Sequence, residues 1–189
     1  WLDSKKKLFF MLKVIQDLKK IVPILAYQRF RDEHSIVVSR DVLLFSLQCL
    51  KSHIGYQYSL LTSISGVDFL GKDYRFCVVY ELLSLNFNSR IRVKTFVNEV
   101  ISVPSVVEIY INANWWEREV WDMFGIYFEN HPDLRRILTD YGFEGYPLRK
   151  DFPLYGFIEV RYDESKKQVV SEPVELTQEF RSFTFQTPW

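Results

Sequence analysis

The feature that most restricts the fold of this chain is residues 112–153, a short stretch with three prolines, three glycines and many aromatic side chains. Proline removes a backbone donor and glycine favours turns, so the second half of the stretch cannot lie inside a sheet. The breaks fall at Gly142, Gly145, Pro147 and Pro153. We therefore expect a segment that turns repeatedly.

The first part of the stretch predicts a helix that ends at Gly125, because glycine suits a left-handed residue after the last helical turn. Asn114 is a good N-cap, and Glu117 three residues later predicts a capping box. An apolar stripe supports the helix and consists of Trp116, Val120, Met123 and Phe124.

A second short helix is predicted to start at Pro132 or Asp133. Proline fits the first turn of a helix, and aspartate is favoured near its positive end. Farther on, the glycines permit the turns, and residues 149–151 are expected to pin the loop.

These residues resemble a known family. The matching motifs are Glu117-Arg118-Glu119, Asp122-Met123-Phe124, His131, Arg135-Arg136-Ile137-Leu138, residues 140–153 and residues 172–183. Together they resemble the 30 kDa subunit of respiratory NADH:ubiquinone oxidoreductase (complex I). The resemblance covers residues 106–189, whereas residues 1–105 are merely compatible with it.

The resemblance implies a subunit of the hydrophilic arm, beside the 49 kDa-type subunit that helps to form the quinone pocket. It implies no cofactor and no active site on this chain; FMN, iron–sulfur clusters, NADH and ubiquinone belong to other subunits. The implied location is the matrix side of the mitochondrial inner membrane, or the cytoplasmic side of a bacterial plasma membrane. Composition favours the mitochondrial alternative, because two alanines beside 16 Phe and 11 Tyr are typical of an AT-rich genome.

The resemblance also assigns a set of motif and interface residues: Glu117, Arg118, Glu119, Trp121, Asp122, Gly125, His131, Pro132, Asp133, Arg135, Arg136, Asp140, Gly142, Gly145, Pro147, Arg149, Lys150, Asp151 and Pro153. Within this set we expect the acidic residues of the helix to form ion pairs with Arg118, Arg135, Arg136 or a neighbouring chain. Three tryptophans, Trp115, Trp116 and Trp121, surround the helix, and core and interface positions are equally compatible with them.

Charge and composition exclude several classes of function. Lysine plus arginine equals aspartate plus glutamate, 24 against 24, which disfavours nucleic acid and with it an RNA-binding module. The aromatic content of 17% is high, as is common at subunit contacts. In residues 5–28, charged side chains interrupt every apolar run, which excludes a transmembrane segment there.

The sequence offers no set of residues for redox chemistry. Cys49 and Cys77 are the only cysteines, and an iron–sulfur cluster needs four ligands. No glycine-rich motif of the kind that cradles phosphates follows a strand. The alternative function is a free-standing metal-dependent hydrolase that uses Glu119, Asp122 and His131, since the two acids share a helix face.

The rest of the chain predicts an α+β fold, a two-layer domain with helices on one face of a mixed, mainly antiparallel sheet. The expected elements are a helix at 5–28, two strands within 27–39, a helix from 39 or 41 to 55, and strands at 58–70, 74–85 and 90–97. We expect an α+β body at 1–105, a helix–loop motif at 106–153, and a hairpin with an extended docking tail at 154–189.

Overall fold

The computed structural model describes residues 14–31, 33–187 and 189. The chain divides into two compact units, Trp1–Asp151 and Phe152–Trp189, so the expected body and nearly all of the motif region share the first unit. Within the described residues, no helix is both long enough and apolar enough to cross a bilayer.

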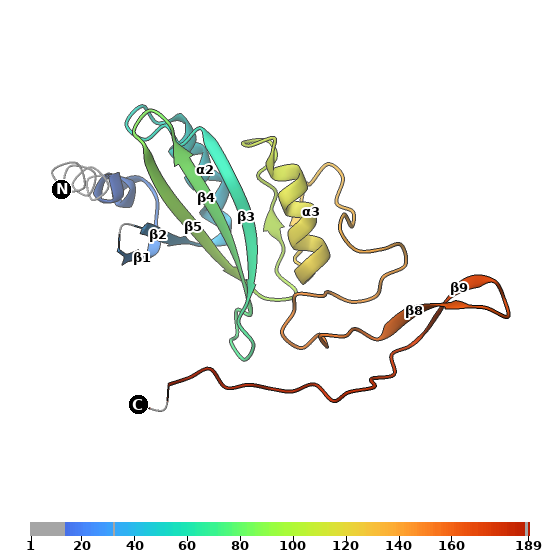
Figure 1. Cartoon of the computed structure of the whole chain (residues 1–189). Helices are drawn as coiled ribbons and strands as arrows, with labels where there is room; N and C mark the ends of the chain where they lie inside the picture. The colour runs from blue at the N-terminus through green and yellow to red at the C-terminus, as the bar shows by residue number, and fades with distance from the viewer. Residues whose placement is uncertain (1–13, 32, 188) are drawn as a thin grey trace. The chain divides into compact units, whose positions relative to one another are not determined.

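The first unit is built on a five-stranded sheet in the order β1-β2-β5-β4-β3 (Figure 1). The strands are β1 (Ile24–Phe30), β2 (Glu33–Val38), β3 (Leu60–Asp68), β4 (Phe76–Ser84) and β5 (Ser89–Val97). Among the described pairs of this sheet, β2–β5 is parallel and the other three are antiparallel. The prediction of an α+β fold with a mixed, mainly antiparallel sheet is thus confirmed.

Helices and short elements complete this unit. They are a helix that runs to residue 21, η1 (Arg40–Val42), α2 (Leu43–Ser52), β6 (Val103–Pro104), α3 (Ala113–Phe124) and β7 (Phe128–Glu129). Figure 1 shows α2 behind the sheet and α3 beside β3. β6 precedes α3 in the sequence and β7 follows it, and these two short strands pair in parallel.

The core lies where these helices meet the sheet. On β4, alternate residues point into it because successive side chains of a strand face opposite sides. Phe76, Val78, Tyr80 and Leu82 are all buried there. Val120 and Phe124 of α3 join the same cluster, and Trp116 and Met123 pack against it, so the predicted apolar stripe faces the core.

Two element predictions are wrong. The first helix does not reach residue 28: it ends at 21, and β1 starts at Ile24, directly after Pro23. Proline cannot continue the helical hydrogen-bond pattern. The residues before Val14 lie outside those described. No helix starts at Pro132 or Asp133; residues 131–139 form turns instead.

The second unit contains one hairpin, β8 (Ile158–Asp163) paired with β9 (Gln168–Pro173), as predicted. One face of this hairpin is apolar, and Ile158, Val160, Tyr162 and Val169 are exposed on it. The other face carries an ion pair between Arg161 and Glu172 at 2.7 Å. Residues 174–189 have no regular structure where they are described.

Candidate functional site

Helix α3 carries two acidic side chains that are fully buried, Glu117 and Asp122. The helix starts one residue before the predicted N-cap, so the capping box is wrong. Its N-cap is Asn112, whose side-chain amide donates to the carbonyl oxygen of Leu61 at 2.7 Å and does not cap the helix. Tertiary packing draws Glu117 inward, away from the helix terminus.

Asp122 holds the turns that follow β7. Its Oδ2 accepts hydrogen bonds from the backbone N–H groups of Ile137, Leu138 and Thr139, at 3.2, 2.8 and 2.9 Å. Its Oδ1 accepts one from the Thr139 hydroxyl at 2.6 Å and lies 3.1 Å from Arg136 Nη1. Three successive amides thus converge on one carboxylate, and these bonds explain why the segment turns without becoming a helix.

The same bonds set the protonation of Asp122. Burial acts to raise the pKa of this carboxyl, but the hydrogen bonds from Thr139 and from the neighbouring amides outweigh burial and lower the pKa below its ordinary value. Asp122 is therefore a stable anion whose oxygens are already occupied.

Glu117 holds the segment after β6. Its Oε2 accepts a hydrogen bond from the Ser105 hydroxyl and its Oε1 accepts one from the backbone N–H of Val106, both at 2.7 Å. Nε2 of His131, in the turn after β7, lies 3.7 Å from Glu117 Oε2. Burial raises the pKa of Glu117 to about 7, although both hydrogen bonds act to lower it.

The predicted ion pairs form only in part. Arg136 pairs with Asp122 as expected, whereas Arg135 pairs with exposed Asp133 at 2.8 Å. Arg118, another of the expected partners, is buried and donates instead to the carbonyl oxygens of Arg135 and Arg136, at 3.2 and 3.3 Å. Glu119 makes no ion pair within the part of the chain that the structure describes.

The alternative metal site has no support. Among the described residues, no group of three or more His, Cys, Asp or Glu side chains is placed to hold a metal ion. His131 approaches Glu117 instead of Glu119, and Asp122 is occupied by residues 136–139. The spacing of Glu119 and Asp122 was compatible with a shared ligand role, but the oxygens of Asp122 are bound by residues 137–139.

The C-terminal end of α3 forms a second contact with the loop. Gly125 has φ 74°, the left-handed conformation expected for it. Arg149 Nε donates to the carbonyl oxygen of Phe124 at 2.7 Å, and its guanidinium lies 4.6 Å from the ring centre of Tyr146. Trp121 meets the same ring edge-on at 5.9 Å. The glycine therefore leaves room for Tyr146 and Arg149 against the helix end.

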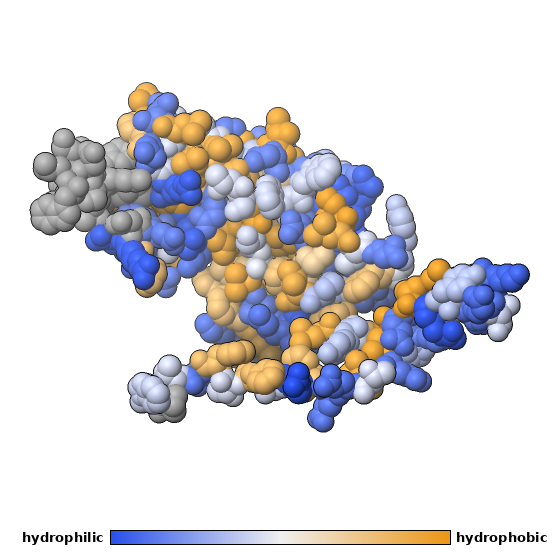
Figure 2. Space-filling view, viewed as in Figure 1, coloured by the Kyte–Doolittle hydropathy of each residue, from blue (hydrophilic) through white to orange (hydrophobic). Residues whose placement is uncertain are grey.

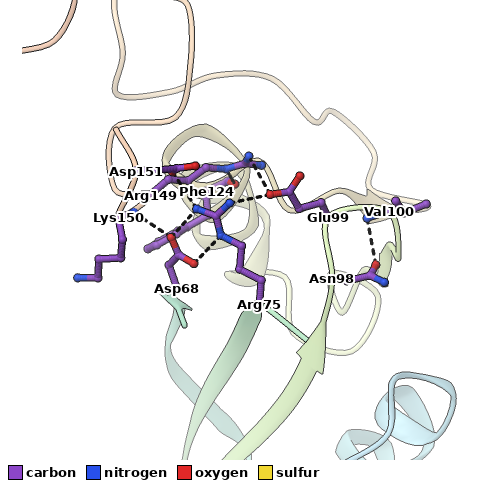
Figure 3. Close-up of polar contacts among 9 residues, drawn as sticks. All are labelled: Asp68, Arg75, Asn98, Glu99, Val100, Phe124, Arg149, Lys150 and Asp151. Atoms are coloured by element: carbon purple, nitrogen blue, oxygen red, sulfur yellow. Dashed lines mark hydrogen bonds and ion pairs between the residues drawn. The ribbon is translucent and has the colours of Figure 1, made fainter. Parts of the chain in front are cut away.

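Arg75 is the centre of an ion-pair network that joins this loop to the sheet (Figure 3). Its Nε and Nη2 contact the two oxygens of Asp68 at 2.7 and 2.9 Å. Its Nη1 lies 2.7 Å from Glu99, and its Nη2 lies 2.8 Å from Asp151. The side chain of Arg75 is 14% exposed and that of Asp68 is 0% exposed, so this ion pair is largely buried. Glu99 and Asp151, the other partners of Arg75, are more exposed.

The loop contributes further contacts to this network. Arg149 Nη1 lies 3.5 Å from Glu99, and the backbone N–H of Lys150 donates to Asp68 Oδ2 at 2.8 Å. Residues 149–151 are thus bound to the β3–β4 hairpin through Asp68 and Arg75, and to the segment after β5 through Glu99; the sequence motifs include none of these three side chains. One signal was available, since Asp68 and Arg75 lie at the facing ends of the strands predicted at 58–70 and 74–85 and so lie near each other across the hairpin.

The remaining motif residues lie around these contacts. Pro132 and Asp140 are exposed, Gly142 and Gly145 have φ values of 75° and 94°, and the Gly145 carbonyl accepts from Arg136 at 3.0 Å. Pro147 follows Tyr146 within the loop, whereas Pro153 belongs to the second unit. The tryptophans divide: Trp116 packs against the core, Trp121 is half-buried, and Trp115 is 69% exposed.

Comparison with known proteins identifies relatives of this arrangement. Residues 36–157 match the family model described as the 30 kDa subunit of the respiratory-chain NADH dehydrogenase. NADH-ubiquinone oxidoreductase subunit 9 of Reclinomonas americana is 52% identical over 180 residues, which cover 95% of this chain and 87% of that protein. NADH dehydrogenase [ubiquinone] iron-sulfur protein 3 of Arabidopsis thaliana is 62% identical over 147 residues, 77% of each chain.

A solved structure shares the fold. A chain of the membrane-bound sulfane sulfur reductase, an archaeal respiratory membrane complex, superposes with a TM-score of 0.65 at 27% identity. The match covers 84% of this chain and 98% of the archaeal one.

Several relatives carry the words "iron-sulfur" in their names. Cys49 on α2 and Cys77 on β4 are the two cysteines of this chain, whereas a cluster takes four thiolates or, in the Rieske type, two thiolates and two histidines. Burial raises the pKa of both thiols, that of Cys77 to about 11, and this opposes the thiolate form that binds iron.

The family match spans well over half of the chain, and the relatives cover most of it at more than 50% identity. The matched region contains β3, β4 and β5 of the sheet, α3 and the loop that Asp122 and Arg75 hold in place. The chain therefore belongs to the family of the 30 kDa subunit of the respiratory-chain NADH dehydrogenase, complex I.

Proposed function

We propose that this chain is a structural and assembly subunit of the hydrophilic arm of proton-pumping NADH:ubiquinone oxidoreductase. In this role it holds the neighbouring cluster-binding and quinone-binding subunits, on which hydride oxidation, electron transfer and quinone reduction take place. The observation that carries the proposal is that the buried motif acids are bound to the chain's own backbone. Asp122 and Glu117 together accept hydrogen bonds from four backbone amides, so they shape a loop instead of facing a substrate.

The outer side of the motif region is the first part of the proposed docking surface. Apolar side chains there are exposed although the segment is well ordered by hydrogen bonds, and exposed apolar groups of this kind are typical of contact surfaces. They are Trp115, Leu138, Tyr141 and Leu148. The partner we propose for this surface is the 49 kDa-type subunit of the quinone pocket.

The second unit is the other part of the proposed docking surface. A two-stranded hairpin alone is marginally stable in water, so the exposed apolar face of β8 and β9 is suited to a partner. The following tail continues this character with Leu176, Phe180, Phe183, Phe185 and Trp189, all exposed. Apolar side chains of this unit are visible on its surface in Figure 2.

We also propose that the chain binds no cofactor and lies on the matrix side of the mitochondrial inner membrane. The number and the raised pKa of the thiols support the first statement. Relatives from plants and from Reclinomonas, all eukaryotes, support the second, as does the alanine-poor, phenylalanine-rich composition.

The proposal is tested by replacing an exposed motif residue that contributes little to the fold. Arg135 is 68% exposed and pairs only with Asp133 among the described residues, so Arg135→Ala should leave the fold intact. We expect less assembled complex on native electrophoresis of membrane extracts, with unchanged turnover per assembled complex. Arg29→Ala, outside the motif and also exposed, is the matched control and should assemble normally. Normal assembly of Arg135→Ala with lost turnover would contradict a scaffold role.

A further inference from the structure

Glu117 and His131 form a cluster of two titratable side chains inside the first unit. Both side chains are 0% exposed, and their nearest charged-group atoms, Glu117 Oε2 and His131 Nε2, lie 3.7 Å apart. Glu117 comes from α3, and His131 from the turn after β7. The function proposed above uses Glu117 only as an acceptor that shapes the chain, and makes no use of its ability to bind a proton.

The hydrogen bonds of His131 describe a neutral ring. Its Nε2 lies 3.1 Å from the carbonyl oxygen of Asn114, which only accepts, so Nε2 carries a hydrogen and donates. Its Nδ1 accepts from the backbone N–H of Asp133 at 3.1 Å, so Nδ1 carries none. This arrangement is the Nε2–H tautomer, and it leaves Glu117 without a positively charged partner on that side.

The other groups around Glu117 do not supply a positive charge. Ser105 and Val106, after β6, donate neutral hydrogen bonds. From β4, Tyr80 faces Glu117; it is fully buried, and its hydroxyl has no hydrogen-bond partner in the described chain. Arg118, the next residue of α3, donates to the carbonyl oxygens of residues 135 and 136 instead. Burial thus opposes the carboxylate form, and only neutral donors offset it.

We propose that Glu117 is a proton-binding site, and that its protonation tightens the attachment of the segments after β6 and after β7 to α3. Protonation removes a charge from an apolar interior, whereas the open state of these segments exposes the carboxyl to water, where the charge costs little. Burial, the largest influence, raises the pKa of Glu117 to about 7 from its ordinary value of 4.5. The direction agrees with the contacts.

The sign of the pH dependence follows from the raised pKa. Below the ordinary value both states are protonated, and the contribution to stability is fully present. As the pH rises through the folded value, the open state has already lost its proton, and the contribution is lost. The two segments are therefore expected to open more readily at pH 7 and above than in mild acid.

The test measures hydrogen exchange of the assembled complex by mass spectrometry at several pH values, after correction for the intrinsic pH dependence of exchange. In the wild type, amide protection in the peptides around residues 103–110 and 128–139 should fall roughly twenty-fold between about pH 5.5 and about pH 7.5. Glu117→Gln keeps the size of the side chain but cannot titrate, so this fall should disappear. Glu119→Gln, half-buried two residues away, is the matched control and should keep the wild-type fall. An unchanged fall in Glu117→Gln would overturn the proposal.

A second variant separates titration from a structural role and decides the matter if Glu117→Gln does not assemble. The Ser105 hydroxyl donates to the carboxylate and lowers the pKa of Glu117, so Ser105→Ala should move the midpoint of the protection change to higher pH. A structural role alone would lower protection equally at every pH. A midpoint that stays in place would overturn the proposal.

Discussion

At the scale of single residues, Asp122 is the buried side chain that fixes the turns at residues 137–139 of the family motif. It has four hydrogen bonds from residues 137–139 and an ion pair with Arg136, all made by a side chain that is fully buried. Asp122→Ala leaves three amides without their acceptor. We expect the free energy of opening of residues 137–139 to fall by about 3–5 kcal/mol, measured by amide hydrogen exchange in the complex.

The control for this prediction is an acid of the same segment that lies in water. Asp133 pairs with Arg135, and the two side chains are 59% and 68% exposed, so Asp133→Ala should cost about 0–1 kcal/mol. A similar loss in both variants would show that burial of Asp122 is not the cause.

The pH dependence of stability in acid provides an independent check on the lowered pKa of Asp122. Its pKa lies below the ordinary value of 3.8, so its contribution is present above that value and is lost as the pH falls through the folded pKa. The difference between wild type and Asp122→Ala should therefore be constant near neutral pH and should shrink only in strong acid. A difference that shrinks above about pH 5 would contradict the lowered pKa.

The residue-scale predictions from sequence succeeded where a partner was near in the chain. Asp122 and Arg136 lie within one short motif, and their pairing was predicted. Glu117 was assigned to a capping box because its spacing from Asn114 fits one, but the Ser105 hydroxyl and the Val106 amide bind it from another segment. Spacing reports local geometry, and a buried acid selects whichever donors the tertiary fold brings to it.

At the scale of elements, the contact between α3 and β3 depends on Gly66. A Cβ atom at this position would lie 2.5 Å from Cδ2 and 2.7 Å from Cε2 of Phe124, so any side chain would push the helix away. Gly66→Ala should destabilise the α3–β3 contact by about 1–3 kcal/mol, seen as faster exchange of α3 amides. Phe124→Leu in the same chain should recover part of the loss, because the smaller side chain leaves room.

A glycine with a different constraint separates this clash from backbone strain. Gly71 has φ 86° in the β3–β4 turn, and its added Cβ would meet nothing within 4 Å. Gly71→Ala should therefore cost only the strain of a left-handed alanine, about 1–2 kcal/mol, and should leave exchange in α3 unchanged. If exchange of the α3 amides also became faster in Gly71→Ala, this would contradict the assignment of Gly66 as the contact residue.

Element types were predictable because hydrophobic period identifies them, and the strands of the sheet appear near their expected ranges. Element ends were less so. Pro23 ends the first helix earlier than its apolar period suggested, and the second short helix at Pro132 is replaced by turns around Asp122. In the first case a proline, and in the second the hydrogen bonds to Asp122, outweigh a sequence pattern that would otherwise favour a helix.

At the scale of the whole molecule, the ion-pair network of Arg75 connects regions that are far apart in sequence. It binds Asp68 at the end of β3, Glu99 after β5 and Asp151, the last residue of the first unit. The part of this network that lies in the loop was predictable from sequence, because residues 149–151 belong to the motif. The part that lies in the sheet was not predicted, because Asp68 and Arg75 lie outside the motifs.

This connection between sheet and loop also bears on the proposed assembly role. Arg75→Met keeps the length of the side chain but leaves Asp68 buried without its partner, which costs about 3–5 kcal/mol. The residue from which the second unit continues, Asp151, then also loses its ion pair. We expect the amount of assembled complex on native electrophoresis to fall strongly, with unchanged turnover in the complexes that form.

Two further variants make this result specific. Asp68→Asn added to Arg75→Met removes the unpaired buried charge, so assembly should be partly restored. Arg161→Met breaks a pair with Glu172 that is exposed to solvent, and it should assemble close to the wild-type level. If Arg161→Met impaired assembly as much as Arg75→Met, the loss would follow from removing any arginine. If Asp68→Asn brought no recovery, the buried charge would not be the cause. If Asp68→Asn restores assembly in the Arg75→Met background, the unpaired charge between sheet and loop causes the defect. Neither replacement changes the apolar surfaces proposed to meet the partner.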